Sequence, residues 1–286
     1  IPLYNKEKFV ENAIKSIINQ GFTDYEVIII NDCSTDESKT IASRFVSEKI
    51  QLIEHNENKG LSASRNTGIK IAKAQYITFL DADDEWKPNY LSKIYSLITT
   101  FPEAKLFATN YEELYRNNVK IISKSKYITE GDGIIDDFIG SNLGKPIYCS
   151  CSLCVEKSVF ETIGFYNEKI TYGEDVDFNI RANSKFKLAY SQEALVTYTQ
   201  ISENQITNSF LYNKTIPDFN SFEVVAKENR QLKKYLDFNR YVFAKNYKLE
   251  NNVEKFREIK LQIDFNNLNY KQVILLYCPN FVLKMI

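Results

Sequence analysis

The sequence predicts an α/β fold: a doubly wound, mostly parallel sheet with a C-terminal helical appendage. In the first hundred residues, segments with apolar residues at helical spacing alternate with short runs that are apolar throughout. The connections between these segments are short, as they are in βαβ units. From about residue 211 the alternation stops, and the remaining chain has a helical pattern.

The expected elements follow one another closely from the N-terminus. The first helix begins near Phe9, with Asn5 placed to cap it and Gly21 to end it. Residues 26–30 form an apolar run typical of a buried parallel strand. The further elements are a helix seeded at 34–36, a strand at 50–53, a helix at 61–74, a strand at 76–80, a helix with Pro88 in its first turn, and a strand at 106–109. Ligands of such sheets bind beyond the carboxyl ends of the strands, so polar residues there are the first functional candidates.

The segment 211–286 differs from the rest of the chain in its charge. It has 13 Lys and Arg against 8 Asp and Glu, a net charge of +5, whereas the whole chain carries -1. Two interpretations stay open. The segment could be a helical appendage packed on the main domain, or a basic surface that meets an anionic membrane.

The overall composition is that of an ordinary soluble protein, with 44% hydrophobic and 26% charged residues. No long stretch is strongly basic, so we expect no nucleic-acid partner. No run approaches the roughly 18 apolar residues of a membrane span, and no secretory signal is visible. Because the chain begins with Ile1 and not with Met, we expect its N-terminus to be trimmed or to lie further upstream.

The cysteines are five in number, which argues against a disulfide framework and for a reducing compartment. We therefore expect a cytoplasmic protein, with a possible place on the inner face of the cell membrane. Cys149, Cys151 and Cys154 lie close together, but no second Cys or His pair accompanies them, and the single histidine is His55. A structural zinc site needs four ligands, so buried thiols on a strand are the preferred interpretation.

An acidic run, Asp81-Ala82-Asp83-Asp84, follows the strand expected at 76–80. Two carboxylates two residues apart can project toward one hard cation and leave room for phosphate oxygens. Such a cation would neutralise the charge that develops on a departing diphosphate. The alternative is that Asp81 and Asp83 cap the following helix. Three acids in four residues exceed what a cap needs, because like charges repel unless a cation binds.

Polar residues at other strand ends could line the same crevice. Tyr4 could stack on a base, and the carboxylate of Asp32 could accept the N–H of that base. Residues 58–68 open a helix whose N-terminal N–H groups, with Arg65, are suited to phosphate or to orienting acids. The alternative for Arg65 is a position on a solvated helix face. A P-loop is absent from the sequence.

A second acidic pair, Glu174 and Asp175, follows Gly173 and opens a helix. A carboxylate at a helix N-terminus is stabilised by the helix dipole, stays ionised and can accept a proton. The alternative is that these acids merely cap the helix.

These segments together resemble the family 2 glycosyltransferases, which have the GT-A fold. The matching stretches, in the order and spacing of the family, are residues 1–5, 31–36, 58–66, 79–84 and 173–175. The resemblance covers roughly residues 1–200 and carries little beyond residue 210. It implies a GT-A catalytic domain at 1–210, with a nucleotide-sugar-binding half at about 1–110 and an acceptor-binding half at about 111–210. Residues 211–286 would form a separate helical region.

On the donor side, the resemblance implies a nucleotide-sugar, most often UDP-linked, bound with Mn²⁺ or Mg²⁺. Pro2 and Tyr4 would line the base pocket, and Asp32 would read the edge of the base. Arg65 would lie near the base or the aspartates. In Asp81-Ala82-Asp83, which would hold the diphosphate, Asp81 would approach the ribose or sugar and also ligate the metal, while Asp83 would be the principal metal ligand.

On the acceptor side, the resemblance implies that Asp175 is the general base and that Glu174 contacts the acceptor or donor sugar. Asp175 would take the proton from an acceptor hydroxyl as its oxygen attacks C1 of the sugar, which inverts the anomeric centre in one displacement. The acceptor would be a glycan or a lipid-linked saccharide. The Asn-, Lys- and Ile-rich composition is typical of AT-rich bacterial genomes, so a bacterial surface glycan is the expected class.

The chain departs from the family in two places. Many relatives carry a His in the stretch that corresponds to 198–202, and this chain has none there, so whether that loop supplies a metal ligand or an acceptor contact stays open. The Gln-x-x-Arg-Trp motif of processive synthases is also absent, which favours single or limited sugar addition. Two other functions stay open: a relative that binds nucleotide-sugar without turnover, and a sugar nucleotidyltransferase. The latter enzymes generally carry a Gly-rich basic loop near the N-terminus, and residues 1–9 contain no glycine.

Overall fold

The computed structural model describes residues 1–122, 131–203 and 205–285. Its strands are β1 (Pro2–Leu3), β2 (Val27–Asn31), β3 (Ile50–Glu54), β4 (Tyr76–Thr78), β5 (Glu85–Trp86), β6 (Leu106–Leu114), β7 (Lys120–Ile122), β8 (Asp132–Ile135), β9 (Leu153–Glu156) and β10 (Leu188–Thr199). Its helices are α1 (Val10–Ile18), α2 (Ser38–Ser43), α3 (Leu61–Ile71), α4 (Tyr90–Thr100), α5 (Phe138–Ser141), α6 (Lys157–Ile163), α7 (Glu174–Asn183), α8 (Glu223–Ala226), α9 (Arg230–Leu249), α10 (Val253–Lys260), α11 (Tyr270–Tyr277) and α12 (Asn280–Leu283).

The N-terminal strands form a small parallel sheet in the order β1-β2-β3, as expected for βαβ units. Helix α1 buries Val10, Ala13, Ile14 and Ile17 in the core that this sheet shares with β10. The expected capping of α1 by Asn5 is wrong. The helix begins four residues later than that cap requires, and the Oδ1 atom of Asn5 instead accepts a hydrogen bond of 2.8 Å from the amide of Thr35.

The second sheet is mixed, and here the expectation of mostly parallel strands is wrong. Its order is β4-β9-β6-β10-β5, with β7 paired to β6 and β8 to β10. Among the described residues, the β6–β10 pair is parallel, and the other pairs are antiparallel. A continuous apolar run indicates that a strand is buried on both faces, but it contains no information about the direction of its neighbours.

Strand β6 is longer than the four residues expected at 106–109 and continues to Leu114. Its second half carries buried polar residues, including Asn110, Glu112 and Glu113, which interrupt the apolar pattern. Pairing with the long strand β10 along its whole length overrides this local polarity. Polar side chains are thereby buried in the middle of the molecule, where they need partners.

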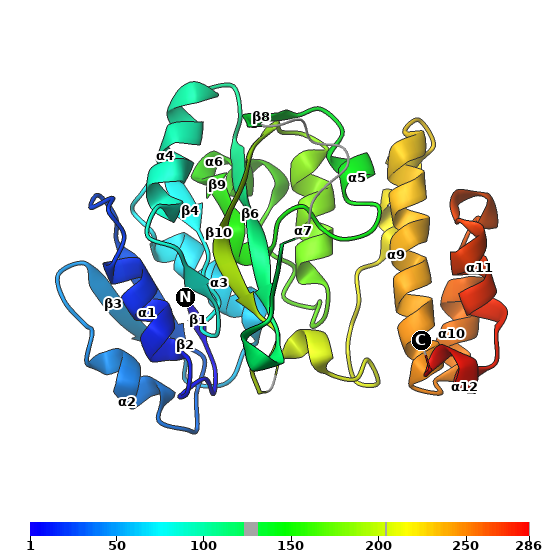
Figure 1. Cartoon of the computed structure of the whole chain (residues 1–286), viewed down its shortest axis with the longest axis horizontal. Helices are drawn as coiled ribbons and strands as arrows, with labels where there is room; N and C mark the ends of the chain where they lie inside the picture. The colour runs from blue at the N-terminus through cyan, green and yellow to red at the C-terminus, as the bar shows by residue number, and fades with distance from the viewer. Residues whose placement is uncertain (123–130, 204, 286) are drawn as a thin grey trace.

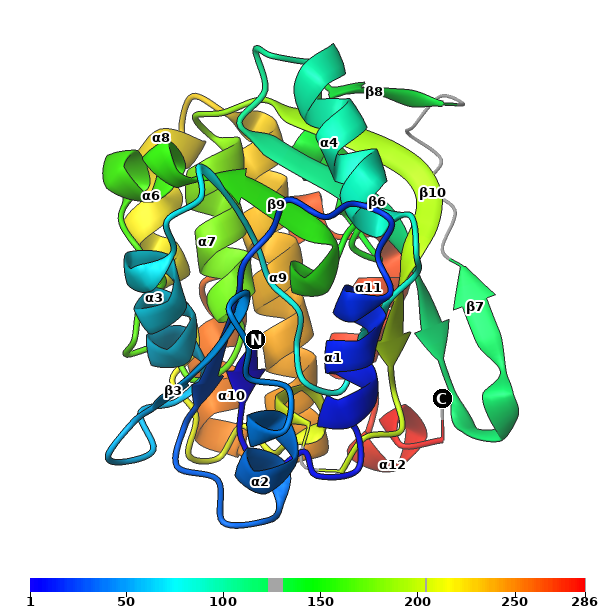
Figure 2. The same ribbon diagram turned by 90° about the vertical axis from the view of Figure 1, so that its left-hand side faces the viewer.

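The segment after residue 211 is helical, and its central element is α9. Figures 1 and 2 show α9 between the mixed sheet with α7 on one side and the smaller helices α10, α11 and α12 on the other. Residues of α9 such as Leu236 and Phe243 belong to the same buried cluster as Phe178 of α7. The limits of the domains at residues 110 and 210 stay a prediction. Within the described residues, no helix has the length and apolar character needed to cross a membrane.

Candidate functional site

Two of the candidate residues, Asp81 and Glu174, bind the guanidinium of Arg65 on α3. Its Nη1 atom donates to Glu174 Oε1 at 2.8 Å, and its Nη2 atom donates to Asp81 Oδ1 at 3.1 Å. The side chain is 1% exposed, so it is not on a solvated helix face. Burial alone would lower the pKa of Arg65, but the two carboxylates raise it well above its ordinary value. Arg65 therefore joins the two acidic motifs, which are far apart in the sequence, through one permanent positive charge.

The rings of Phe79 and Tyr166 also pack against this guanidinium. The guanidinium carbon lies 5.8 Å from the centre of the Phe79 ring and 5.3 Å from that of Tyr166. Asn66, the next residue on α3, bonds to both the amide and the carbonyl of Tyr166. The side chains of two neighbouring helix residues thus fix both the arginine and one of the rings against which it packs.

The three aspartates of the acidic run have three different partners. Asp81 binds Arg65, and Asp83 Oδ2 accepts a hydrogen bond of 2.8 Å from Lys6 Nζ. Asp84 is buried, and its Oδ1 accepts from the amide of Thr199 at 2.8 Å. None of the three caps α4, which has Asn89 at its N-cap and no side-chain cap. The alternative interpretation as a helix cap is therefore wrong.

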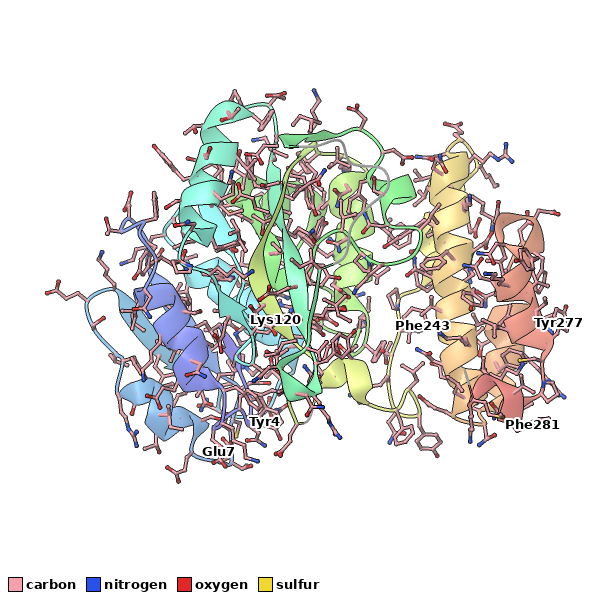
Figure 3. The ribbon with its side chains drawn as sticks, in the orientation of Figure 1. Tyr4, Glu7, Lys120, Phe243, Tyr277 and Phe281 are labelled. Carbon is pink, nitrogen blue, oxygen red and sulfur yellow. The ribbon has the colours of Figure 1, made fainter. Side chains whose placement is uncertain are left out.

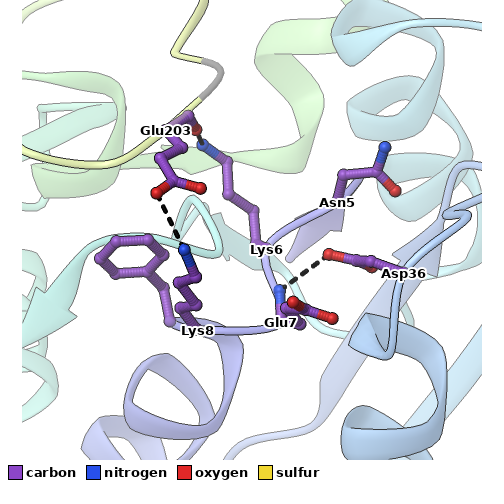
Figure 4. Close-up of a pocket in the computed structure, with 7 residues that line it drawn as sticks. Asn5, Lys6, Glu7, Lys8, Asp36 and Glu203 are labelled. Atoms are coloured by element: carbon purple, nitrogen blue, oxygen red, sulfur yellow. Dashed lines mark hydrogen bonds and ion pairs between the residues drawn. The ribbon is translucent and has the colours of Figure 1, made fainter.

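Lys6 was not expected as a site residue from the sequence. Its ammonium group donates to Asp83, to Ser202 Oγ at 2.8 Å and to the carbonyl of Glu203 at 2.8 Å, and the side chain is only 11% exposed. Figure 4 shows it at a pocket of about 230 Å³ beside the turn that follows β1. Next to it, Lys8 pairs with the carboxylate of Glu203. A lysine one position after Asn5 looks like a solvated residue in the sequence, and only its long-range partners mark it.

Asp84 and Cys151 form a hydrogen-bonded pair below the acidic run. The Cys151 thiol donates to Asp84 Oδ2 at 2.8 Å, and burial raises the pKa of both groups well above their ordinary values. With Asp81, their ligand atoms lie within 4.8 Å of one another. A protonated, buried thiol is a poor ligand for a hard cation, which takes oxygen ligands. This set is better described as a hydrogen-bond network that supports the acidic run.

Among the other cysteines, Cys154 is the one that fits a buried thiol on a strand, and Cys33 is exposed. Cys154 lies on β9 and is buried, which raises its thiol pKa to about 12. Cys149 is only half-buried and, like Cys151, precedes the strand. All five cysteines are free.

The carboxylate of Asp32, at the end of β2, has hydrogen-bond partners within the protein. Asp32 accepts hydrogen bonds from the amides of Lys59 (2.9 Å) and Gly60 (2.7 Å), and it lies 2.6 Å from Nδ1 of His55. The two amides directly before the first turn of α3 therefore hold Asp32, and whether the helix N-terminus receives phosphate stays a prediction. Gly60 has φ +89°, a conformation that favours glycine and turns its N–H toward this carboxylate. His55, whose Nε2 bonds to Thr67, was not expected here.

The residues expected at the base lie at the edge of this arrangement. Pro2 is half-buried on β1, and Tyr4 directly after the strand is 46% exposed, so an aromatic face is accessible. Ala82 is buried between the two site aspartates. Figure 3 shows Tyr4 near the lower edge of the molecule, close to the Lys6 pocket that Figure 4 enlarges.

The acids that open α7 occupy unequal environments. Glu174 is buried and bonded to Arg65, whereas Asp175 is half-buried and accepts a 2.9 Å bond from the amide of Val176 at one oxygen. Burial raises the pKa of Asp175, although Arg65 and the helix amides oppose that rise. Burial also raises the pKa of Glu174. Neither acid serves as the N-cap, which is Gly173, and within the described ranges no hydrogen bond reaches Oδ2 of Asp175.

The comparison with known families gives a match over more than half of the chain. The model of "Glycosyl transferase family 2" matches residues 1–155. Among curated proteins, TuaG of Bacillus subtilis (strain 168), named for teichuronic acid biosynthesis, is 35% identical over 94 residues, 32% of this chain and 37% of TuaG. GlyA of Streptococcus pneumoniae serotype 4, a glycosyltransferase, is 37% identical over 113 residues, 39% of this chain and 16% of GlyA. The matches thus span less than two thirds of these relatives' own lengths.

Longer matches exist at lower identity. EpsH of Bacillus subtilis (strain 168), named as a glycosyltransferase, is 27% identical over 245 residues, which are 82% of this chain and 70% of EpsH. Among solved structures, S. aureus TarS 1-349 in complex with UDP-GlcNAc superimposes with a TM-score of 0.66 at 16% identity. That match covers 96% of this chain and 76% of TarS. It shows a shared fold.

Proposed function

The chain belongs to glycosyl transferase family 2 and has the GT-A fold, and we propose that it is an inverting, metal-dependent glycosyltransferase. It would move a hexosyl or N-acetylhexosaminyl group from a nucleoside-diphosphate sugar to a hydroxyl of a glycan or lipid-linked acceptor. The observation that carries this proposal is the Arg65 bridge. It places the acidic run after β4 and the acidic pair at the start of α7 around one buried charge.

The donor is proposed to be UDP-linked. TarS, whose fold is similar, was solved in complex with UDP and with UDP-GlcNAc. In this chain the exposed ring of Tyr4 is available for stacking on a base, with Pro2 beside it. Asp32, already fixed by two backbone amides, would present its remaining lone pairs to an N–H of the base.

The metal is proposed to bind at Asp83, with Asp81 beside the sugar and ribose. Both groups supply carboxylate oxygens, which Mn²⁺ and Mg²⁺ prefer, and Oδ1 of Asp83 has no partner among the described residues. A divalent cation there would supply stabilisation of the charge on the leaving diphosphate. Lys6 already places one positive charge beside Asp83. Positive charge at this site therefore offsets the repulsion between negatively charged groups.

The general base is proposed to be Asp175. Its free oxygen would take the proton of the acceptor hydroxyl, while Glu174, held by Arg65, would contact one of the sugars. A raised pKa makes a carboxylate a stronger base than an exposed aspartate. A single displacement by the activated hydroxyl inverts the anomeric centre and needs no covalent intermediate.

The acceptor is proposed to be an intermediate of a bacterial surface polysaccharide. Two relatives are named for such pathways, TuaG for teichuronic acid and WcaA of Escherichia coli for colanic acid. If the acceptor is lipid-linked, contact with an anionic membrane would bring the enzyme to it. The outer face of α11 and α12 would make that contact. Tyr270, Ile274 and Tyr277 repeat at helical spacing on α11, Phe281 lies on α12, and all four are 59–71% exposed.

Two substitutions test the division of roles. Asp175→Asn should abolish sugar transfer and leave metal-dependent binding of UDP measured by calorimetry unchanged, because only the proton acceptor is lost. Asp83→Ala should weaken the binding itself. Equal loss of UDP affinity in both variants would contradict the separate roles. Consumption of a nucleoside triphosphate in place of the nucleotide-sugar would identify a nucleotidyltransferase.

A further inference from the structure

The short loop 171–173, which leads into Glu174 and Asp175 at the start of α7, is supported from two sides. On one side, Arg65 of α3 holds the carboxylate of Glu174. On the other side, the chain at Thr215 runs beside the loop. The carbonyl of Thr215 accepts from the amides of Thr171 (2.9 Å) and Tyr172 (3.2 Å), and its amide donates to Thr171 Oγ1 at 2.9 Å. The second support thus comes from the region after residue 211, outside the stretch matched by the family model.

Helix α9 completes this second support through Phe243. Gly173, the N-cap of α7, lies so close to α9 that a Cβ atom there would be 3.1 Å from Cζ of Phe243 and 3.5 Å from Cδ of Pro217. Its φ of +79° independently favours glycine. The ring of Phe243 also meets the ring of Tyr172 edge to face, with centres 5.9 Å apart. Figure 3 shows Phe243 on the side of α9 that faces the sheet and α7.

We propose that α9 positions the loop 171–173 through Phe243, so that the C-terminal region determines where Asp175 stands at the start of α7. This inference rests on the proposed role of Asp175 as general base. Phe243 is 3% exposed, and its Cζ atom lies where a side chain at Gly173, directly before the acidic pair, would be crowded. A ring packed against a glycine leaves the loop little room to move toward α9, and Arg65 limits its movement the other way. Phe243 is a positioning residue, since it reaches the reacting atoms only through the loop.

The same side of α9 carries a tyrosine whose pKa responds to the charge of Asp175. Tyr235 lies eight residues before Phe243, on the same side of the helix. Tyr235 is buried, and burial is the main cause that raises its pKa. The negative charge of Asp175 is the second cause. The other ionisable groups that act on Asp175, or that its charge acts on, are Arg65, Asp81, Tyr148, Tyr166, Tyr172 and Glu174. A shift of α9 would therefore change both the position and the environment of the base.

Substitutions at Phe243 and at a matched phenylalanine on the same helix test this inference. Phe238, which is half-buried, packs on the ring of Tyr241 and points about 140° away from Phe243 around the helix. Phe243→Ala should lower kcat for transfer by about 100-fold, as expected for a misplaced catalytic group, with the donor KM within about twofold of the wild-type value. Phe243→Leu should recover part of the loss, and Phe238→Ala should leave kcat nearly unchanged.

Hydrogen exchange gives a readout that does not depend on activity. The amides of Thr171 and Tyr172 should exchange about tenfold faster in Phe243→Ala than in the wild type, and at the wild-type rate in Phe238→Ala. Unchanged exchange and unchanged kcat in Phe243→Ala would overturn the inference, as would an equal fall of kcat in both alanine variants. A wild-type protein that transfers no sugar would refute the proposed function, while the exchange rates would still decide whether α9 holds the loop.

Discussion

Lys6 is the residue that most changes the interpretation of the acidic run. In the sequence, crowded aspartates imply that a cation binds near them. In the structure, one such cation is the ammonium of Lys6 on Asp83, and another is the guanidinium of Arg65 on Asp81. Part of the charge neutralisation is thus built into the chain. A divalent cation would add to these two groups or take over part of their role.

Replacement of Lys6 should show how the neutralisation of Asp83 is shared between Lys6 and a divalent cation. Lys6→Met leaves the nearly buried Asp83 carboxylate without its ion pair, which should lower the free energy of unfolding by about 3 kcal/mol in urea titrations without metal. Mn²⁺ should then raise the melting temperature of the variant more than that of the wild type, because the ion replaces the missing charge. Lys8→Met, which removes only the exposed pair with Glu203, is the control and should respond to Mn²⁺ like the wild type. An equal Mn²⁺ response in Lys6→Met would argue against metal binding at Asp83.

Asp175 should give the transfer reaction a measurable acid limit. The group is a base only when ionised, and its pKa is raised by burial. The rate should therefore fall as the pH drops through that raised value, above the ordinary value of about 3.9 for aspartate. The measurement is kcat/KM against pH. Asp177→Asn, on the same helix but paired with Arg181, should keep the same limit. A limit at or below the ordinary value would point to a different base.

The structure brings together several of the residues expected from the sequence, but their connections could not be predicted. Arg65, Asp81, Glu174 and Asp175 were each expected near the site. The direct bonds of Arg65 to both acidic motifs follow from tertiary packing that the sequence does not display. The contacts of Lys6 with Asp83 and Ser202 join parts of the chain that lie far apart. Such pairs form when strands and helices pack together, and no local sequence pattern predicts them.

At the level of elements, β6 shows how a strand can bury charge in the middle of a mixed sheet. Glu112 on β6 accepts hydrogen bonds from Lys87 after β5, Lys120 on β7 and Thr197 on β10. Burial would raise its pKa, but these three bonds, with the one from Lys120 the largest, lower it to about 2. A single carboxylate therefore links the ends of three neighbouring segments to β6.

The stability of the sheet should depend on pH through Glu112. Because its folded pKa lies below the ordinary 4.5, its favourable contribution is present above pH 4.5 and is lost as the pH falls toward 2. Glu112→Gln should lower the free energy of unfolding at pH 7 by about 2 kcal/mol, less than the full shift implies because Lys120 is half exposed. The difference from the wild type should vanish near pH 2. Urea unfolding at several pH values measures both quantities.

An exposed glutamate provides the comparison for that experiment. Glu161→Gln on α6 should change the unfolding free energy by no more than about 0.5 kcal/mol. If Glu112→Gln behaved in the same way at pH 7, the three hydrogen bonds would not contribute to the stability of the sheet.

The elements show which part of the fold could be predicted. The helices and parallel strands of the first hundred residues were expected almost as they are, because each has its own periodicity and a short connection. The sheet order after β4 could not be predicted. Its strands pair with partners far away in the sequence, and β6 continues through polar residues such as Glu112, whose partners lie on neighbouring segments.

For the molecule as a whole, charge and apolar surface are distributed unevenly. The region 211–286 carries a net charge of +5, and no acidic residue follows Asp264. On its outer face, Lys260 lies 3.6 Å from the centre of the Tyr277 ring, and Lys271 lies near that of Tyr270. Figure 3 shows Tyr277 and Phe281 at the outer edge, on the opposite side of the helical region from the sheet. Aromatic side chains with lysines beside them are typical of surfaces that lie in the headgroup region of a membrane.

Vesicle binding tests this surface. The protein should sediment with phosphatidylglycerol vesicles and much less with phosphatidylcholine vesicles, because the lysines need anionic headgroups. The double variant Ile274→Ser, Phe281→Ser should bind at least about tenfold more weakly, since each apolar side chain contributes roughly 1.5 kcal/mol or more when buried. Val46→Ser with Tyr95→Ser, at exposed positions in the first hundred residues, is the control and should bind normally. Equal binding to both lipids would refute the role of the basic face.

The parallel pairing of β6 with β10 also affects the order in which a growing chain can fold. Strands β1 to β3 are neighbours in sequence and can pair soon after they leave the ribosome. Strand β6 must wait until β10 has been synthesised, and meanwhile one of its edges stays open, with apolar residues at its start. Pairs so distant in sequence form slowly. We therefore expect nascent chains that end before residue 188 to be the ones that need a chaperone, and release of the chain from that chaperone to follow the arrival of β10.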